Sequence, residues 1–270
     1  MKSSGKQVMN AVRRTIVQIG QDTIAFLEGY GNLTIMTVEA FWAIRKMPRY
    51  VVQVVDQFLY IGRRSLPIVL ITSIFVGLAL GVQIGTQMSP STPAWVEGGL
   101  ILRSVLLEMG PIIIGLILSG RVASGIASEL GAMKVTEQID ALRVLAIDPV
   151  EFLVMPRLVA AMIAVPVLLV FADAASILSG YLSSHFTIHL TWEGFVKGMR
   201  HVFNERDVYT SLIKALIFGI VIIMFGSFFG LNSKRGAKGV GTATTYAVVW
   251  SSVEILALDY IISAILFFIW

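Results

Sequence analysis

The sequence predicts an all-α, polytopic membrane protein with five transmembrane helices preceded by an N-terminal amphipathic, interfacial segment. Apolar residues make up 56% of the 270-residue chain and charged residues only 14%, which is about half the charge of an ordinary soluble domain. Five long apolar stretches follow one another after the first 62 residues. We therefore divide the chain into an N-terminal segment, residues 1–62, and a five-helix domain, residues 63–270.

The N-terminal segment has an apolar stripe rather than a transmembrane pattern. Apolar side chains recur every three or four residues from Val8 to Tyr30, with Arg13 and Arg14 between them, as on one face of a helix. Such a helix lies in the membrane interface or covers the neighbouring bundle. Residues 1–21 have no apolar core, so we expect no cleavable signal peptide.

The five expected spans differ in how many charges interrupt them. The first has 24 residues without a charge, and the fourth has 19, and each is long enough to cross a hydrocarbon core of about 30 Å. The Gly110-Pro111 pair is expected to break the second span. The spans are Ser65–Met88, 100–127, 157–182, Ala215–Ser233 and 242–269.

Basic residues predict the orientation of these spans. Nine Lys or Arg precede the first span, whereas the loop at 89–99 has none. Further bases lie in the loops at 128–156 and 232–241. Because cytoplasmic loops are enriched in Lys and Arg, we expect a multi-pass protein of the cytoplasmic (inner) membrane, with its N-terminus in the cytoplasm and its C-terminus outside.

Four acidic residues interrupt the apolar spans: Glu108, Asp173, Glu254 and Asp259. An acid is costly in lipid and should face a cavity or a partner. For the last three we favour an internal hydrogen bond that fixes helix packing. Glu108 is as good a candidate for a polar pocket, because it lies beside the expected helix break.

Glycines are spaced four residues apart in two spans. Gly77, Gly81 and Gly85 lie on one face of the first span, and Gly226 and Gly230 on one face of the fourth. This spacing lets another helix backbone approach closely. The neighbour is either a helix of the same chain, which we favour, or a second subunit.

The loop at 128–156 contains a short amphipathic helix, expected at about residues 136–147. Thr136 is its expected N-cap and Pro149 its stop. A membrane surface and a partner's groove both suit such a helix, but its acidic polar face favours a protein partner. We expect Ile139 and Leu142 to enter the partner's groove, with polar contacts at its rim. The expected contact segment is Glu137, Gln138, Ile139, Asp140, Ala141 and Leu142.

Several separate motifs, from the second span through this loop to the last span, occur in an order that closely resembles the MlaE/YrbE family of ABC-transporter permeases. They are Leu107-Glu108-Met109-Gly110-Pro111, Gly120-Arg121, Glu129-Leu130-Gly131-Ala132-Met133, Thr136 to Leu142, Asp148-Pro149, Pro156-Arg157 and Leu258-Asp259-Tyr260. Leu107 stands where many relatives have Arg.

The resemblance implies the permease subunit of a phospholipid transporter. It implies a homodimer, with residues 137–142 as the helix that couples it to a cytoplasmic ABC ATPase. It also implies an MCE-domain lipid-binding protein outside and, in many systems, a small STAS-domain protein. In such a dimer we expect a lipid chamber lined by Val76, Leu80, Glu108, Gly110 and Pro111.

Other chemistries find no support in the residues. Gly236 to Thr242 lacks the GK[ST] ending of a Walker A loop, so ATP and Mg²⁺ are expected on the separate ATPase and this chain is not an enzyme. His185 and His189 lack the Glu of a metalloprotease motif, so we expect no metal and no cofactor. The total charge of +4 suggests no nucleic-acid partner. An ion-coupled carrier or channel and a non-transporting scaffold are the alternative functions.

Overall fold

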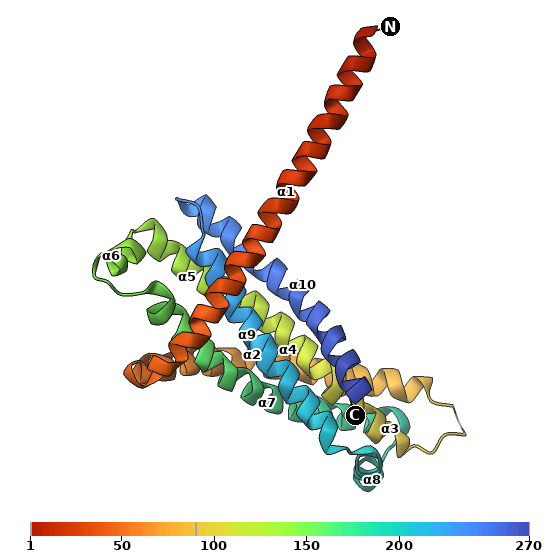
Figure 1. Cartoon of the computed structure of the whole chain (residues 1–270). Helices are drawn as coiled ribbons and strands as arrows, with labels where there is room; N and C mark the ends of the chain where they lie inside the picture. The colour runs from red at the N-terminus through yellow and green to blue at the C-terminus, as the bar shows by residue number, and fades with distance from the viewer. Residues whose placement is uncertain (1, 90, 270) are drawn as a thin grey trace.

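The computed structural model describes residues 2–89 and 91–269, and this part of the chain is helical with no strand (Figure 1). The α-helices are α1 Lys2–Ala43, α2 Val51–Gln87, α3 Val96–Ser104, α4 Gly110–Leu118, α5 Ser124–Val135, α6 Gln138–Val144, α7 Met155–Ile188, α8 Trp192–Val202, α9 Glu205–Leu231 and α10 Ala237–Ile269. A 3₁₀ helix, η1 Ile44–Arg49, and three π-helical turns, η2 Val105–Met109, η3 Ser119–Ala123 and η4 Val150–Val154, join some of them.

Five helical segments are long and apolar enough to cross a membrane, which confirms the predicted fold class. They are Val51–Gln87, Val96–Val135, Val150–Ile188, Glu205–Leu231 and Ala237–Leu266. The helices begin earlier than the uncharged stretches, because a helix continues through charged residues that a hydropathy window excludes. Helix α2 thus runs through the boundary drawn after residue 62, and that division of the chain stays a prediction.

The expected break at Gly110-Pro111 is wrong. The second span continues from α3 through η2 into α4, and Pro111 lies in the first turn of α4. Proline is tolerated there because it has no N–H to donate, and the wider π turn before it lets the Gly110 N–H bond to the Val105 oxygen.

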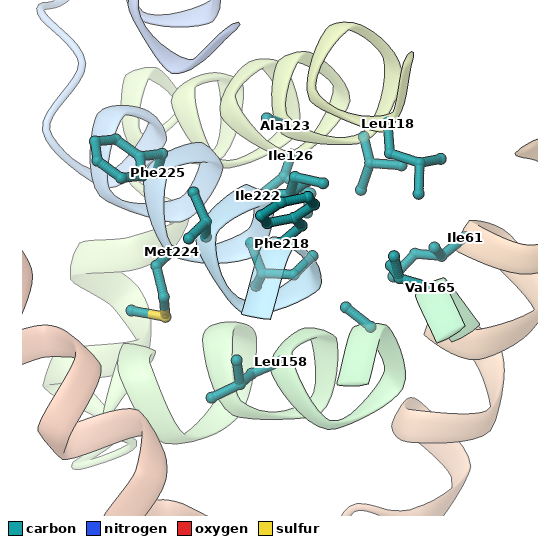
Figure 2. Packing of buried hydrophobic residues seen from close by; sticks show 14 of the residues in the cluster. Ile61, Leu118, Ala123, Ile126, Leu158, Val165, Phe218, Ile222, Met224 and Phe225 are labelled. Carbon is teal, nitrogen blue, oxygen red and sulfur yellow. The ribbon is translucent and has the colours of Figure 1, made fainter. Parts of the chain in front are cut away.

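Helix α9 lies at the centre of the buried core (Figure 2). Its Phe218 and Ile222 are almost completely buried, and they pack between side chains of the second span, such as Ile126, and of α7, such as Leu158. Gly226 fits against Ala123, since a Cβ there would lie 2.9 Å from the Ala123 oxygen. The glycine face of α9 therefore serves packing within the chain.

The glycine face of α2 also packs within the chain. A Cβ on Gly77 would lie 2.0 Å from the Ser176 oxygen, and one on Gly81 would lie 2.7 Å from the Gly180 oxygen. Both oxygens belong to α7, which makes its most extensive contact with α2. The internal interpretation of this motif is confirmed, and the subunit contact expected as its alternative is wrong.

The second half of α1 covers the bundle, whereas its first half projects beyond it (Figure 1). Leu33, Met36 and Ala40 are buried, and α1 contacts α9, α7 and η4. The Tyr30 hydroxyl donates to Glu254 of α10 at 3.2 Å, so the internal hydrogen bond expected for Glu254 is confirmed. Of the stripe from Val8 to Tyr30, Tyr30 packs against the bundle, and the position of the rest stays a prediction.

Alternate connections lie at opposite ends of the bundle. Helix α6 and the turn from α9 to α10 lie at one end, and the turn after α2, helix α8 and the end of α10 lie at the other (Figure 1). The segment 183–207, after the third expected span, is largely helical, because α7 extends to Ile188 and Thr191 caps α8 by accepting the Gly194 N–H at 3.2 Å. Which end faces the cytoplasm stays a prediction.

Candidate functional site

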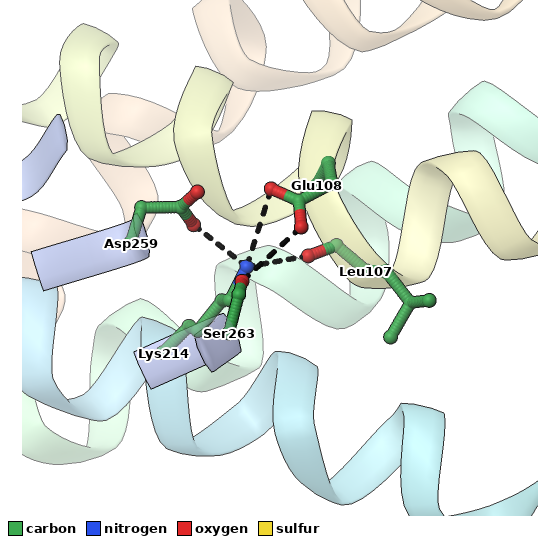
Figure 3. A network of polar contacts seen from close by, with 5 residues as sticks. All are labelled: Leu107, Glu108, Lys214, Asp259 and Ser263. Carbon is green, nitrogen blue, oxygen red and sulfur yellow. Dashed lines mark hydrogen bonds and ion pairs between the residues drawn. The ribbon is translucent and has the colours of Figure 1, made fainter. Parts of the chain in front are cut away.

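A buried lysine joins three spans at one point. Lys214 of α9 is fully buried, and its Nζ lies 2.8 Å from Asp259 Oδ1 of α10 and 3.4 Å from Glu108 Oε2 of η2 (Figure 3). Ser263 of α10 donates a hydrogen bond of 3.2 Å to the other oxygen of Glu108. We call these four residues the Lys214 cluster.

The π turn also supplies a hydrogen-bond acceptor for the lysine. Lys214 Nζ donates to the Leu107 carbonyl oxygen at 2.6 Å. In an α-helix that oxygen would accept from the N–H of residue 111, but residue 111 is a proline and has no such group. The proline thus leaves an acceptor that the lysine uses, and this is the local reason for the position of Lys214.

The Lys214 cluster pairs charged groups, each of which would be costly by itself at membrane depth. A cation or an acid at membrane depth costs several kcal/mol unless it is paired, and here one cation lies between two acids. The internal contact expected for Asp259 is therefore confirmed as an ion pair. Sequence reasoning missed Lys214, which directly precedes the uncharged run from Ala215. The sequence did contain a signal: acids within apolar spans need a cation nearby.

A cavity of about 470 Å³ opens beside the cluster. Glu108 forms part of its wall, and the Glu108 side chain is 44% exposed. Arg103 lies in the same wall and is 3.5 Å from Asp207. Leu107 and Leu266 add apolar surface. The cavity therefore offers both charged groups and apolar surface to a ligand.

Of the five residues expected to line a lipid chamber, only Glu108 lines this cavity. Leu80 packs against a small buried cluster that includes Val105, and Val76 is half-buried. Gly110 and Pro111 are buried, so neither widens the cavity. The other four do not line this cavity, and the lipid chamber expected in a dimer stays a prediction.

Asp173 lies directly behind the π turn. It is 7% exposed, and Ser211 donates to its Oδ2 at 3.5 Å, whereas its Oδ1 has no hydrogen-bond partner in the described part of the chain. A Cβ on Gly110 would lie 2.0 Å from Oδ1, so only glycine allows this approach. The internal hydrogen bond expected for Asp173 is present. Gly110, which was expected to line a lipid chamber, instead leaves room for the Asp173 carboxyl group.

The short helix after the second span is α6, Gln138–Val144, which is shorter than the expected 136–147. Thr136 is not its N-cap, because its hydroxyl donates back to the Ala132 oxygen at 3.0 Å. Glu137 takes the cap position with a left-handed φ of 60°. The helix is thus started by a backbone turn rather than by a side-chain cap.

The apolar face of α6 is directed differently from our expectation. Ile139 is only 3% exposed and belongs to the core of this chain, and Leu142 packs partly against that core. Val144 and Leu145 are instead 86% and 68% exposed. The expectation that Ile139 enters a partner's groove is wrong for this conformation, because the side chain already has its apolar contacts.

Comparisons with known proteins found similar sequences. The family model described as permease MlaE matches residues 54–265. A probable ABC transporter permease protein of Rickettsia felis is 36% identical over 249 residues, covering 92% of this chain and 96% of the relative. The intermembrane phospholipid transport system permease protein MlaE of Haemophilus influenzae is 30% identical over 258 residues, covering 93% and 97%.

Proposed function

Because the chain belongs to the permease MlaE family, we propose that it is the membrane-spanning permease subunit of an ABC transporter that moves phospholipid between membranes. ATP and Mg²⁺ would bind a separate ATPase subunit. The observation that carries the proposal is the cavity beside the Lys214 cluster, which combines charged groups with apolar surface in a chain with five spans. A phospholipid has the same combination of a charged headgroup and apolar chains.

In this proposal the cavity receives the headgroup end of the lipid. Arg103 in its wall supplies a positive charge for a phosphate, and the half-exposed Glu108 can accept hydrogen bonds from headgroup hydroxyl or amine groups. Leu107 and Leu266 would contact the start of an acyl chain. Lys214 positions Glu108 from behind, since its own side chain is fully buried.

The test is lipid-stimulated ATP hydrolysis by the complex of this chain with its ATPase, reconstituted in vesicles. We expect phospholipid to stimulate the wild-type complex. Glu108→Gln should reduce the stimulation, whereas Glu193→Gln, at an exposed position of α8, should not. An ion-coupled carrier would respond to an ion gradient without ATP. A scaffold would show neither response, and either result would refute the proposal.

We further propose that α6 is the contact with the ATPase, with the segment Glu137 to Leu142 at its base and Val144 and Leu145 as the anchors. The few anchor side chains that dominate a protein interface contribute about 2 kcal/mol or more each, that is, about 30-fold in affinity. Val144→Asp with Leu145→Asp should therefore release the ATPase while the chain stays in the membrane. The exposed Asp140→Lys should weaken binding less and in a salt-dependent way. Normal ATPase retention by the double variant would contradict the assignment.

The remaining partners are proposed from the family resemblance. They are a second copy of this chain, an MCE-domain lipid-binding protein, and a small STAS-domain protein in systems that have one. Purification in mild detergent, followed by mass spectrometry of the bound proteins and lipids, tests all three. Recovery of a monomer without an MCE-domain protein, under conditions that retain the ATPase, would contradict the proposed assembly.

A further inference from the structure

The turn between α9 and α10 carries a second cavity, of about 380 Å³, at the opposite end of the bundle from the turn after α2. Three cations, Lys234, Arg235 and Lys238, lie in its wall, and no acidic residue does. In the part of the chain that the structure describes, none of the three forms an ion pair with an acid. The cavity therefore has a positive charge that the chain leaves uncompensated.

The backbone holds these cations in a tight turn. Gly236 has a φ of +87°, which favours glycine, and a Cβ on Gly239 would lie 2.0 Å from the Lys234 oxygen. The first turn of α10 contains no acidic residue, so the positive end of a long helix dipole adds to the charge of the three side chains. The glycines of the Gly236–Thr242 motif thus serve the shape of this turn.

A buried hydroxyl in the same wall has no partner. Ser233 is 5% exposed, and its Oγ makes no hydrogen bond among the described residues. An unsatisfied buried polar atom costs about 1–3 kcal/mol, and it calls for an explanation in terms of a ligand or a function. Ser233 lines the cavity, but its Oγ is buried, so its side chain would have to rotate before a ligand there could supply the missing acceptor.

An aromatic surface continues from this cavity along α10. Phe229 and Tyr246 lie in its wall with ring centroids 5.9 Å apart. Phe229 also lines a smaller, mostly apolar cavity of about 180 Å³ that contains Trp250, one helical turn beyond Tyr246. From Lys238 to Trp250 the helix rises about 18 Å. A charged group at one end and a long apolar surface at the other match the shape of a lipid.

We propose that this groove binds an anionic phospholipid of the membrane, with its phosphate at the basic turn and an acyl chain against Phe229, Tyr246 and Trp250. Three uncompensated cations favour a lipid with net negative charge over a zwitterionic one. The aromatic continuation favours a lipid over the acidic surface of a protein. The site is separate from the Lys214 cluster and does not depend on the proposed transport function.

The test uses the purified full-length chain in detergent and phosphatidylglycerol that carries a photoreactive diazirine on one acyl chain. Crosslinks are mapped by mass spectrometry to the peptide spanning residues 228–250, at lipid concentrations below saturation. Each cation near an anionic lipid contributes about fivefold in affinity. The double variant Arg235→Gln, Lys238→Gln should therefore lose about 30-fold in crosslink yield on this peptide. The matched control, Lys197→Gln with Arg200→Gln on α8, also removes one lysine and one arginine charge, but at the other end of the bundle. It should keep the wild-type crosslink yield.

Three further arms separate the possible ligands. Phosphatidylcholine with the same diazirine chain should give a low yield on this peptide, and inorganic phosphate at the lipid concentration should not compete. Equal yields for the two lipids, or for the two variants, would overturn the proposal. Full competition by inorganic phosphate would show a plain anion site instead. If the variant Arg235→Gln, Lys238→Gln kept the lipid crosslink but no longer retained the ATPase, the cations would be assigned to a protein partner instead.

Discussion

Replacement of Lys214 by methionine tests the Lys214 cluster most directly. Methionine keeps most of the length and the apolar stem but removes the cation. Asp259, whose side chain is 8% exposed, then loses the charge that lies 2.8 Å away. Breaking a buried ion pair by removing one partner costs about 3–5 kcal/mol. The lost hydrogen bond to the Leu107 oxygen adds about 1 kcal/mol, so Lys214→Met should lower the free energy of unfolding by about 4–6 kcal/mol.

The assay is reversible unfolding of the purified chain in mixed detergent micelles, followed by circular dichroism. Lys197→Met, at an exposed lysine of α8, is the matched control and should change the free energy by less than about 0.5 kcal/mol. The double variant Lys214→Met, Asp259→Asn removes the unpaired charge as well. It should therefore be less destabilised than the sum of its single variants, by about 1–3 kcal/mol.

Two results would refute this reasoning. If Lys214→Met were as stable as the control, the cation would not be needed to compensate the buried acids. If the two substitutions were additive, Lys214 and Asp259 would not interact in the folded chain, and the ion pair would carry none of the cost.

Three other predictions concern packing, the α1 contact and topology. Gly77→Ala should destabilise the chain by about 1–3 kcal/mol through overpacking against α7, whereas Gly62→Ala, with nothing within 4 Å of its Cβ, should not, in the same unfolding assay. Burial, followed by the nearby Glu254 charge, raises the pKa of the Tyr30 phenol. The bond that it donates should therefore persist at pH 10 and be lost as the pH rises through the folded-state pKa, with faster proteolysis of α1, and Tyr30→Phe should remove this pH dependence. A reporter fused to the C-terminus should be active outside the cytoplasm, and a cytoplasmic signal would contradict the predicted orientation.

Local composition was sufficient to predict the class of protein and the number of spans. The cost of moving a side chain from water into lipid is a property of that side chain, so a window of sequence contains the needed information. The same holds for the acid in the second span, since Glu108 is costly in lipid wherever the chain folds. The order of the motifs around it then indicated the family, which the comparisons confirmed.

The partners of these residues were decided only by the tertiary structure. Lys214 and Glu108 lie 106 positions apart in the sequence, and no local pattern states that η2, α9 and α10 meet at one point. The glycine face of α2 and the apolar side of α6 each suited more than one neighbour as patterns. The close approach of the α7 backbone to Gly77 decided for a neighbour within the chain, and Ile139 is buried in the core of its own chain, which neither alternative had included. Helix packing depends on contacts between surfaces that are distant in the chain.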